Sequence, residues 1–128
     1  MWRLLVVDDD ASNCKMLREF LQDKAYCDVA FNGKEALQAL IEAPQIGRKY
    51  DAILLDFSMP VLDGGQVLKS LREQEKLQGV PEGRGVPVIM ISAHEEVVIS
   101  CFKECCDDYL VKPYSLVVLI EKLNKLIR

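Results

Sequence analysis

The sequence lacks an apolar stretch long enough to cross a membrane. A spanning helix needs roughly 18 to 20 apolar residues, and every apolar run in this chain is far shorter. The sequence also lacks a basic balance, because its formal charge is -4, whereas nucleic-acid surfaces need clustered Lys and Arg. The amino terminus enters an apolar run almost at once, so we expect no signal peptide. These absences predict a cytoplasmic protein that binds neither membranes nor nucleic acid directly.

Paired cysteine motifs are missing as well. The chain has five cysteines, an odd number, and no CxxC spacing. Disulfide frameworks and zinc sites are typical of paired, regularly spaced cysteines. We therefore expect reduced thiols, most of them small core residues: Cys14, Cys27, Cys101, Cys105 and Cys106.

Apolar residues, in contrast, are plentiful. Half of the 128 residues are hydrophobic, which is enough to fill a single core in a chain of this length. We find no repeat, low-complexity tract or linker. The sequence therefore predicts one domain over residues 1–128.

Two short apolar runs end in carboxylates: residues 4–7 lead into Asp8, Asp9 and Asp10, and residues 53–55 lead into Asp56. Such runs are typical of strands that are covered on both faces, and the side chains just past their carboxyl ends line the crevice where open α/β sheets bind ligands. Like charges at this range must take up protons or bind a cation. Oxygen ligands alone favour a hard ion, so we expect Mg²⁺ before Ca²⁺.

The hydrophobic pattern predicts strands that alternate with helices five times. We expect strands at residues 4–7, 27–31, 52–55, 88–91 and 109–111. Asp10 or Ser12, Asp63 and Ser115 are expected to cap helices. The helices are predicted from apolar residues at helical spacing: Cys14, Leu17, Phe20 and Leu21; Ala36, Leu37, Leu40 and Ile41; Val67, Leu68 and Leu71; Val98, Cys101, Phe102 and Cys105; and Leu116, Leu119, Ile120, Leu123 and Ile127.

This (βα)5 order predicts an α/β fold, a doubly wound parallel five-stranded sheet of the flavodoxin-like kind. The strand order 2-1-3-4-5 fits best, because it puts the half-exposed second strand at an edge. It also places the first and third strands side by side at the switch point of the sheet. We therefore expect Asp8, Asp9 and Asp56 to lie together.

Four motifs follow the ends of the first, third, fourth and fifth expected strands: Val6-Val7-Asp8-Asp9; Leu55-Asp56 with Met59-Pro60 and Asp63-Gly64; Ser92-Ala93; and Lys112-Pro113. In this order they resemble the response-regulator receiver domain of two-component signalling, and the resemblance covers essentially the whole chain. It implies a switch that takes a phosphoryl group from a phosphohistidine donor and relays the change. Such a domain catalyses its own phosphorylation and dephosphorylation but is no conventional enzyme.

The resemblance also implies roles for single residues. Asp56 would be the phosphoacceptor and Asp8 and Asp9 the pair that holds Mg²⁺, with the backbone carbonyl of Ser58 completing the shell. Ser92 would be the switch hydroxyl, Tyr109 the switch aromatic, and Lys112 the lysine that neutralises the phosphoryl group. Ser58 and His94 would flank the path of the hydrolytic water and tune dephosphorylation. The Lys112-Pro113 bond would be cis.

Simpler interpretations stand beside these roles. Asp10 and Asp63 are expected to be helix caps rather than metal ligands, and His94 taken alone is expected to face solvent. A flavodoxin-like electron carrier is disfavoured because three aspartates would repel the flavin phosphate. A haloacid-dehalogenase-type phosphatase would need an acid two residues after Asp56, where Ser58 stands. A pseudo-receiver that is not phosphorylated stays the serious alternative.

The resemblance implies partners of two kinds. A histidine kinase or a histidine phosphotransfer protein would supply the phosphoryl group. A target or output domain would bind the face made by the fourth helix, fifth strand and fifth helix, and phosphorylation could be linked to a homodimer. The sequence does not identify the kinase, signal, target or oligomeric state, and does not separate a single-domain regulator from a receiver within a larger protein.

Overall fold

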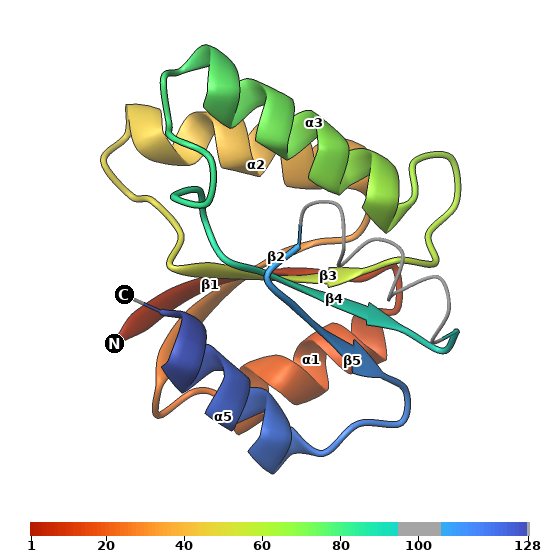
Figure 1. Ribbon diagram of the computed structural model, residues 1–128. Helices are drawn as coiled ribbons and strands as arrows, with labels where there is room; N and C mark the ends of the chain where they lie inside the picture. The colour runs from red at the N-terminus through yellow and green to blue at the C-terminus, as the bar shows by residue number, and fades with distance from the viewer. Residues whose placement is uncertain (95–105, 128) are drawn as a thin grey trace.

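The computed structural model describes residues 1–94 and 106–127. Their strands form one parallel sheet in the order β2-β1-β3-β4-β5 (Figure 1). This is the predicted order, and it places β2 and β5 at the edges. The strands are β1 (Trp2–Val7), β2 (Ala25–Ala30), β3 (Ala52–Asp56), β4 (Val88–Ser92) and β5 (Asp108–Val111).

Helices cover both faces of the sheet, as predicted. In Figure 1, α1 (Ala11–Phe20) and α5 (Leu116–Leu126) lie below the sheet, and α2 (Gly33–Gln45) and α3 (Gly64–Leu77) lie above it. The fourth expected helix, with Val98, Cys101, Phe102 and Cys105, falls outside the described residues. With right-handed crossovers, the helix changes face where the chain reverses its direction across the sheet, so α1 lies on one face and α2 and α3 lie on the other.

The central strands are apolar on both sides because both sides are buried. Successive side chains of a strand point to opposite faces, so Leu4 and Val6 pack with α1 and α5, whereas Leu5 and Val7 pack with α2 and α3. The predicted thiols that the structure describes, those of Cys14, Cys27 and Cys106, are buried and free of disulfides. Cys101 and Cys105 lie outside the described residues.

Side-chain caps fix where the helices begin. Asp10 rather than Ser12 caps α1, since its Oδ1 accepts the N–H of Ser12 at 2.9 Å. Asp63 and Gln66 form a reciprocal capping box at the start of α3, and Ser115 caps α5. Asp63 is therefore a structural cap, as predicted, and it fixes where α3 begins after the loop that follows β3.

Two expectations about aromatic residues were wrong. Phe31 does not extend β2, which ends at Ala30 opposite Val7, and the Phe31 N–H donates to the Glu35 side chain at 2.8 Å instead. Phe31 is 46% exposed. Phe20 is 41% exposed at the last residue of α1, because the buried stripe of this helix is narrower than predicted and contains Cys14 and Leu17.

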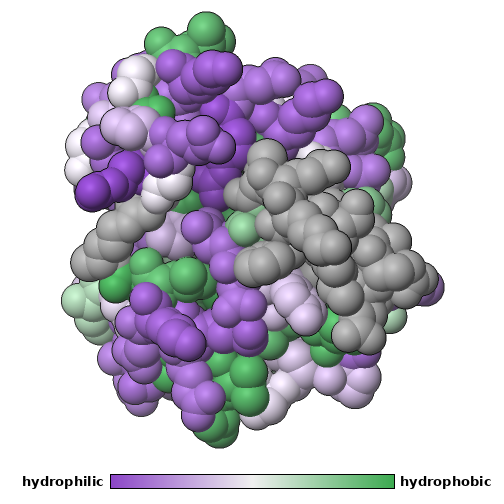
Figure 2. Space-filling model, in the orientation of Figure 1, coloured by the Kyte–Doolittle hydropathy of each residue, from purple (hydrophilic) through white to green (hydrophobic). Residues whose placement is uncertain are grey.

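The surface carries hydrophobic residues in separate patches. Figure 2 shows hydrophilic residues over most of the visible face, broken by isolated hydrophobic areas. Exposed large apolar side chains include Leu77 at the end of α3 and Val117 in α5. Within residues 1–94 and 106–127, no helix combines the length and the apolar character that a membrane span requires.

Candidate functional site

Three carboxylates meet at the carboxyl ends of β1 and β3. Val7 pairs with Leu55 in the parallel register, so the residues that follow them lie side by side. One carboxylate oxygen from each of Asp8, Asp9 and Asp56 lies within 4.8 Å of the others. Asp8 and Asp56 are only 7% and 4% exposed, whereas Asp9 is exposed. The structure thus brings together the acids that the sequence analysis singled out.

The charge of this cluster is unfavourable for Asp56. Burial, followed by the neighbouring charge of Asp8, raises the pKa of Asp56 from 3.8 to about 6. The Lys112 ammonium and the Ser58 N–H act in the opposite direction but do not restore the ordinary pKa. A bound divalent cation would relieve the repulsion, because it places positive charge among the oxygens.

Short-range contacts hold Asp8 in place. The backbone N–H of Asp10 donates to Asp8 Oδ1 at 2.9 Å, and Asn13 Nδ2 in α1 donates to Asp8 Oδ2 at 3.4 Å. The Asp10 side chain caps α1 through its Oδ1. Asp10 therefore contributes to the site through its backbone N–H, which binds Asp8. Asn13 was not among the predicted site residues, although its position one turn into the helix after Asp8 could have indicated it.

The buried thiol of Cys14 contacts the backbone of Asp8. Cys14 Sγ lies 3.4 Å from the Asp8 carbonyl oxygen, to which it donates. Burial first, and then the charges of Asp8, Asp10 and Asp9, raise the pKa of the Cys14 thiol to about 11. The thiol stays protonated at neutral pH and is therefore a poor nucleophile.

Lys112 approaches Asp56 from the end of β5. Its Nζ lies 3.5 Å from Asp56 Oδ1, and its backbone N–H donates to the Ser92 carbonyl at 2.8 Å. The Lys112-Pro113 peptide bond is cis, as the resemblance implied. The lysine thus supplies a positive charge on the side of Asp56 opposite the acidic pair.

Ser92 is completely buried at the carboxyl end of β4. Its Oγ accepts the backbone N–H of His94 at 3.0 Å. Ser92 pairs with Val111, which directly precedes Lys112. The serine and the lysine therefore lie at the same carboxyl end of the sheet, on the neighbouring strands β4 and β5. Ser92 also directly follows Ile91, which pairs with Asp56, so it lies on the strand next to the phosphoacceptor candidate.

The loop after β3 needs a glycine. Gly64 opens α3 so close to the strand that a Cβ there would lie 2.6 Å from the Asp56 carbonyl oxygen. The Gly64 N–H donates to the Phe57 carbonyl at 2.9 Å, and the Ser58 N–H donates to Asp56 Oδ1 at 3.3 Å. The Asp63-Gly64 motif was recognised in the sequence, but the reason for glycine is visible only in space.

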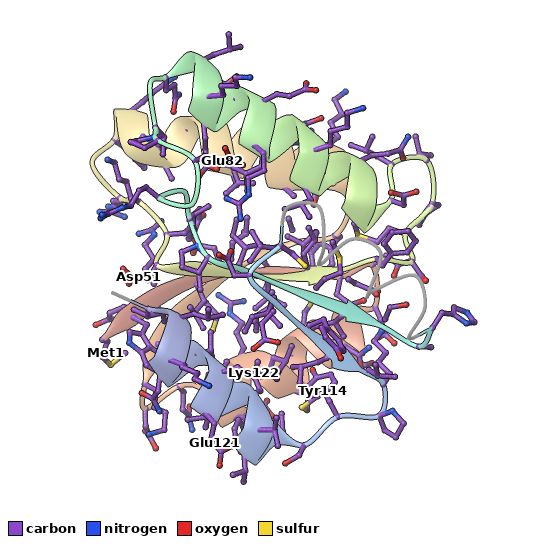
Figure 3. All side chains as sticks on the ribbon, in the orientation of Figure 1. Met1, Asp51, Glu82, Tyr114, Glu121 and Lys122 are labelled. Carbon is purple, nitrogen blue, oxygen red and sulfur yellow. The ribbon has the colours of Figure 1, made fainter. Side chains whose placement is uncertain are left out.

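Two tyrosines lie near the ends of β5. Tyr109 is half-buried against the core on the α2–α3 side, and Lys122 Nζ lies 5.7 Å from its ring centroid. Burial, and then the charges of Asp8 and Asp56, raise the pKa of Tyr114. Tyr114 and Asp51 lie toward opposite ends of the sheet (Figure 3). Tyr114 therefore belongs to the end that carries the acids.

Comparison with protein families gives a match over most of the chain. A family model described as the response regulator receiver domain matches residues 4–124. The transcriptional regulatory protein ResD of Bacillus subtilis is 36% identical over 129 residues, which cover 98% of this chain and 48% of ResD. The chain thus spans about half the length of ResD, and also about half the length of the similar transcriptional regulatory protein PcoR of Escherichia coli.

Solved structures of similar size share the fold. The response regulator protein TrrA from Thermotoga maritima, in complex with Mg²⁺ and BeF, is 30% identical with a TM-score of 0.79, and the alignment covers 99% of this chain and 100% of TrrA. The receiver domain of the sensor histidine kinase PA1611 from Pseudomonas aeruginosa, with a magnesium ion in its active-site cleft, is 27% identical with a TM-score of 0.79. That alignment covers 98% of this chain and 96% of the other.

Proposed function

Because the chain belongs to the response regulator receiver domain family of two-component signalling, we propose that Asp56 accepts a phosphoryl group from a phosphohistidine donor and that this chain is a phosphorylation-dependent switch. The observation that carries the proposal is the setting of Asp56: a buried carboxylate that faces two further acids on one side and Lys112 on the other. A carboxylate held among metal-binding oxygens and one cation is suited to phosphoryl transfer.

The transfer is an in-line displacement. An oxygen of Asp56 forms a bond to phosphorus while the phosphorus–nitrogen bond of the donor breaks, and the electron pair stays on the imidazole. Lys112, 3.5 Å from Asp56 Oδ1, neutralises one oxygen of the transferred group, and the Ser92 hydroxyl donates to another. Acetyl phosphate can replace the donor, with acetate as the leaving group.

Mg²⁺ is the proposed cofactor, since the donor set consists of carboxylate oxygens within 4.8 Å of one another and fits a hard ion. Asp9 and Asp56 would ligate it directly, Asp8 would act through water, and the Ser58 carbonyl would complete the shell. When bound, the ion supplies neutralising charge to the phosphoryl oxygens. Asp8 is held in position by its bonds from Asp10 and Asn13.

The switch couples Ser92 to Tyr109. In the unphosphorylated chain the Ser92 oxygen accepts from the His94 N–H. When the hydroxyl turns toward a phosphoryl oxygen, space opens beside β4, and the Tyr109 ring shifts inward between two packings. The ring is half-buried and lies on the neighbouring strand.

Ser58 and His94 are proposed to set the lifetime of the acyl phosphate. Hydrolysis needs a water in line with the bond to Asp56, and these residues flank its approach. Ser58 is small and leaves the path open. The His94 side chain can hydrogen-bond the water, and its ring also adds bulk beside the path. The same chain would thus catalyse both gain and loss of the phosphoryl group.

The proposed donor is a histidine kinase or a histidine phosphotransfer protein in the cytoplasm. The proposed output surface combines β5 and α5 with the fourth helix, which lies outside the described residues. An output domain, a separate target or a phosphorylation-linked homodimer would read this surface. The greater length of ResD fits a receiver that works within a larger protein. The TrrA chain, which the alignment covers completely, fits a single-domain regulator.

Mass spectrometry of the intact chain after incubation with acetyl phosphate tests the proposal. We expect one phosphoryl group per chain, dependent on Mg²⁺, lost in Asp56→Asn and much reduced in Asp9→Ala. Asp23→Asn, at an exposed position on the turn after α1, should label normally. No labelling of the wild-type chain would favour the pseudo-receiver, and undiminished labelling of Asp56→Asn would assign the acceptor to another residue.

A further inference from the structure

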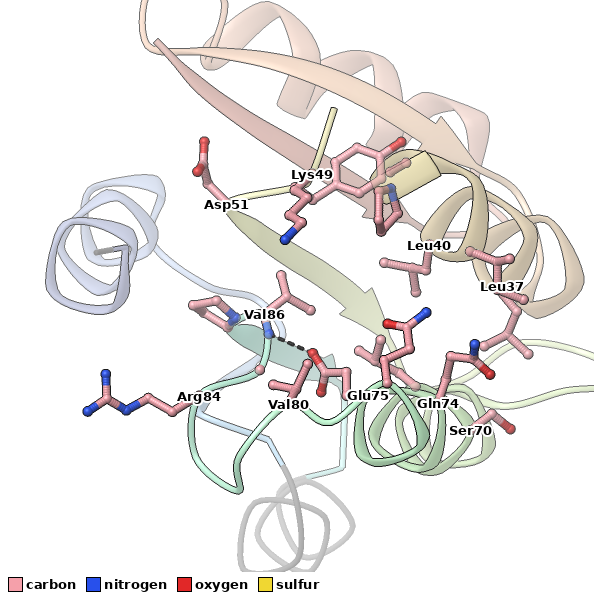
Figure 4. A pocket seen from close by; sticks show the side chains of 18 residues that line it. Leu37, Leu40, Lys49, Asp51, Ser70, Gln74, Glu75, Val80, Arg84 and Val86 are labelled. Atoms are coloured by element: carbon pink, nitrogen blue, oxygen red, sulfur yellow. Dashed lines mark hydrogen bonds between the residues drawn. The ribbon is translucent and has the colours of Figure 1, made fainter. Parts of the chain in front are cut away.

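A cavity opens at the amino end of β3 and β4, at the opposite end of the sheet from the carboxylates. It lies between α2, α3 and the segment that leads into β4 (Figure 4), and its volume is about 530 Å³. Pockets that bind small molecules usually have volumes of roughly 300 to 1,000 Å³. The cavity is therefore large enough for a small organic ligand.

The deeper walls of this cavity are apolar. Leu37 and Leu40 line it from α2, Leu71 from α3, and Val86 from the segment before β4. Figure 4 shows the side chains of Leu40 and Val86 directed toward the hollow. Burial of a hydrocarbon group against these side chains would contribute about 25 cal/mol for each Å² removed from water. An apolar portion of a ligand thus has a place to bind.

The acids at the cavity already have partners. Glu75 Oε1 accepts from Arg72 at 2.7 Å, and Glu75 Oε2 accepts from the Val86 N–H at 2.8 Å. Asp51 Oδ2 accepts from the Arg3 N–H at 2.8 Å, and Figure 4 shows Asp51 pointing away from the hollow. Neither carboxylate is thus left to attract a cationic ligand.

Lys49 provides the charge that faces the cavity. Figure 4 shows its ammonium group pointing into the hollow and the guanidinium of Arg84 pointing away from it. Within residues 1–94 and 106–127, Lys49 forms no ion pair with an acidic side chain. An ammonium group at the mouth of an apolar cavity complements one negative charge.

We propose that this cavity binds a small amphipathic carboxylate, with its hydrocarbon part between Leu40 and Leu71 and its carboxylate on the ammonium group of Lys49. The site is separate from the acidic cluster by the length of β3. It does not depend on the phosphoacceptor role of Asp56, and either proposal can fail without the other.

Titration of the isotope-labelled chain with hexanoate, octanoate and decanoate, followed by NMR, tests the proposal. We expect saturable shifts at Leu37, Leu40, Leu71 and Val86, and weaker binding of the uncharged octan-1-ol. Lys49→Gln should raise the Kd for octanoate about fivefold, the effect of roughly 1 kcal/mol from one lost charge-assisted contact. Lys34→Gln, at an exposed position near the other end of α2, should leave the Kd unchanged.

A filling variant tests the location independently. Ser70 lines the cavity from α3, so Ser70→Leu should abolish octanoate binding, whereas Lys69→Leu, one position along at an exposed site, should not. Circular dichroism melts identify any variant that fails to fold, and Lys49→Gln then decides the question. Absence of saturable binding for all three carboxylates, equal binding of octan-1-ol, or an unchanged Kd in Lys49→Gln would overturn the proposal.

Discussion

The charged side chains at the two ends of the sheet are paired in different ways. At the amino end, ion pairs join separate elements: Arg72 in α3 binds Glu75 and also Asp107 before β5, at 2.7 and 3.0 Å. At the carboxyl end, Asp8 and Asp56 are nearly as buried as the core. Among the described residues, the ion pair that Asp56 forms is with Lys112, whose Nζ lies 3.5 Å from Asp56 Oδ1. The charges at the amino end are paired, whereas the carboxyl end keeps a repulsion between Asp8 and Asp56 that the proposed Mg²⁺ would relieve.

The amino-end contacts also tie segments that are distant in sequence. Asp107 Oδ2 accepts from the Val88 N–H at 2.8 Å and from Arg72, so one carboxylate connects β4, β5 and α3. On the other side, Arg3 in β1 binds Asp28 in β2, and Asp28 also accepts from the Tyr50 hydroxyl at 2.7 Å. Removal of a charge should therefore have opposite effects on stability at the two ends.

The largest expected effect is a gain of stability in Asp56→Asn. The pKa of Asp56 is raised from 3.8 to about 6 without metal, so the folded chain holds this proton more tightly than the unfolded chain. Stability therefore falls as pH rises from about 4 to about 6 and then levels off. The asparagine variant avoids this loss and should be more stable at pH 7 by roughly 3 kcal/mol, the equivalent of the shift.

Urea unfolding at several pH values, in a chelator, measures this gain. The difference between Asp56→Asn and wild type should narrow toward pH 4, because both side chains are then neutral. Asp23→Asn, in an exposed turn, should follow the wild-type curve. A variant that is less stable than wild type at pH 7 would show that the carboxyl end is not under charge repulsion.

The second effect is a loss of stability in Arg72→Met. Methionine retains much of the apolar volume but leaves Glu75 and Asp107 without their cation, and it removes the bond to the Val86 carbonyl at 3.0 Å. Since these groups are partly exposed, we expect a loss of about 2 kcal/mol rather than the full cost of a buried charge. Chemical denaturation measures it, with the exposed Lys69→Met as control. An unchanged free energy of unfolding in Arg72→Met would contradict the proposed difference between the two ends of the sheet.

The smallest effect is the stabilisation by Mg²⁺. An ion that binds only the folded chain should raise the free energy of unfolding by about 1 to 2 kcal/mol at millimolar concentration. Asp9→Asn should lose most of this increment. Asp51→Asn, at the amino end, lowers the starting stability because Asp51 binds the Arg3 N–H, but its increment from Mg²⁺ should be unchanged. Equal increments in all three chains would place the ion elsewhere.

The sequence predicted the carboxyl end better than the amino end. Asp8 and Asp56 directly follow apolar runs, and strand alternation with a right-handed crossover is enough to bring such positions together. Asp63 and Ser115 act as caps through neighbours within three residues. These features are local in sequence, so a pattern of residue types carries them.

What could not be predicted depends on side chains that meet across long sequence separations. Arg72 and Asp107 are 35 residues apart, and no periodicity relates them. The need for glycine at position 64 comes from contact with the Asp56 backbone. The alternating pattern predicted Phe31 to be a strand residue, but its backbone N–H donates to the Glu35 side chain instead. Such contacts follow from the packed fold rather than from the local pattern.

Reductive trapping of the phosphorylated chain tests the central claim most directly. Borohydride reduces an aspartyl phosphate to homoserine, which peptide mass spectrometry can assign to a single position. After treatment with acetyl phosphate and Mg²⁺, we predict homoserine at position 56 in wild type and no homoserine in a sample prepared with a chelator. Homoserine at position 8 or 9, or its absence from a chain that carries a phosphoryl group, would contradict the assignment of Asp56 as the acceptor.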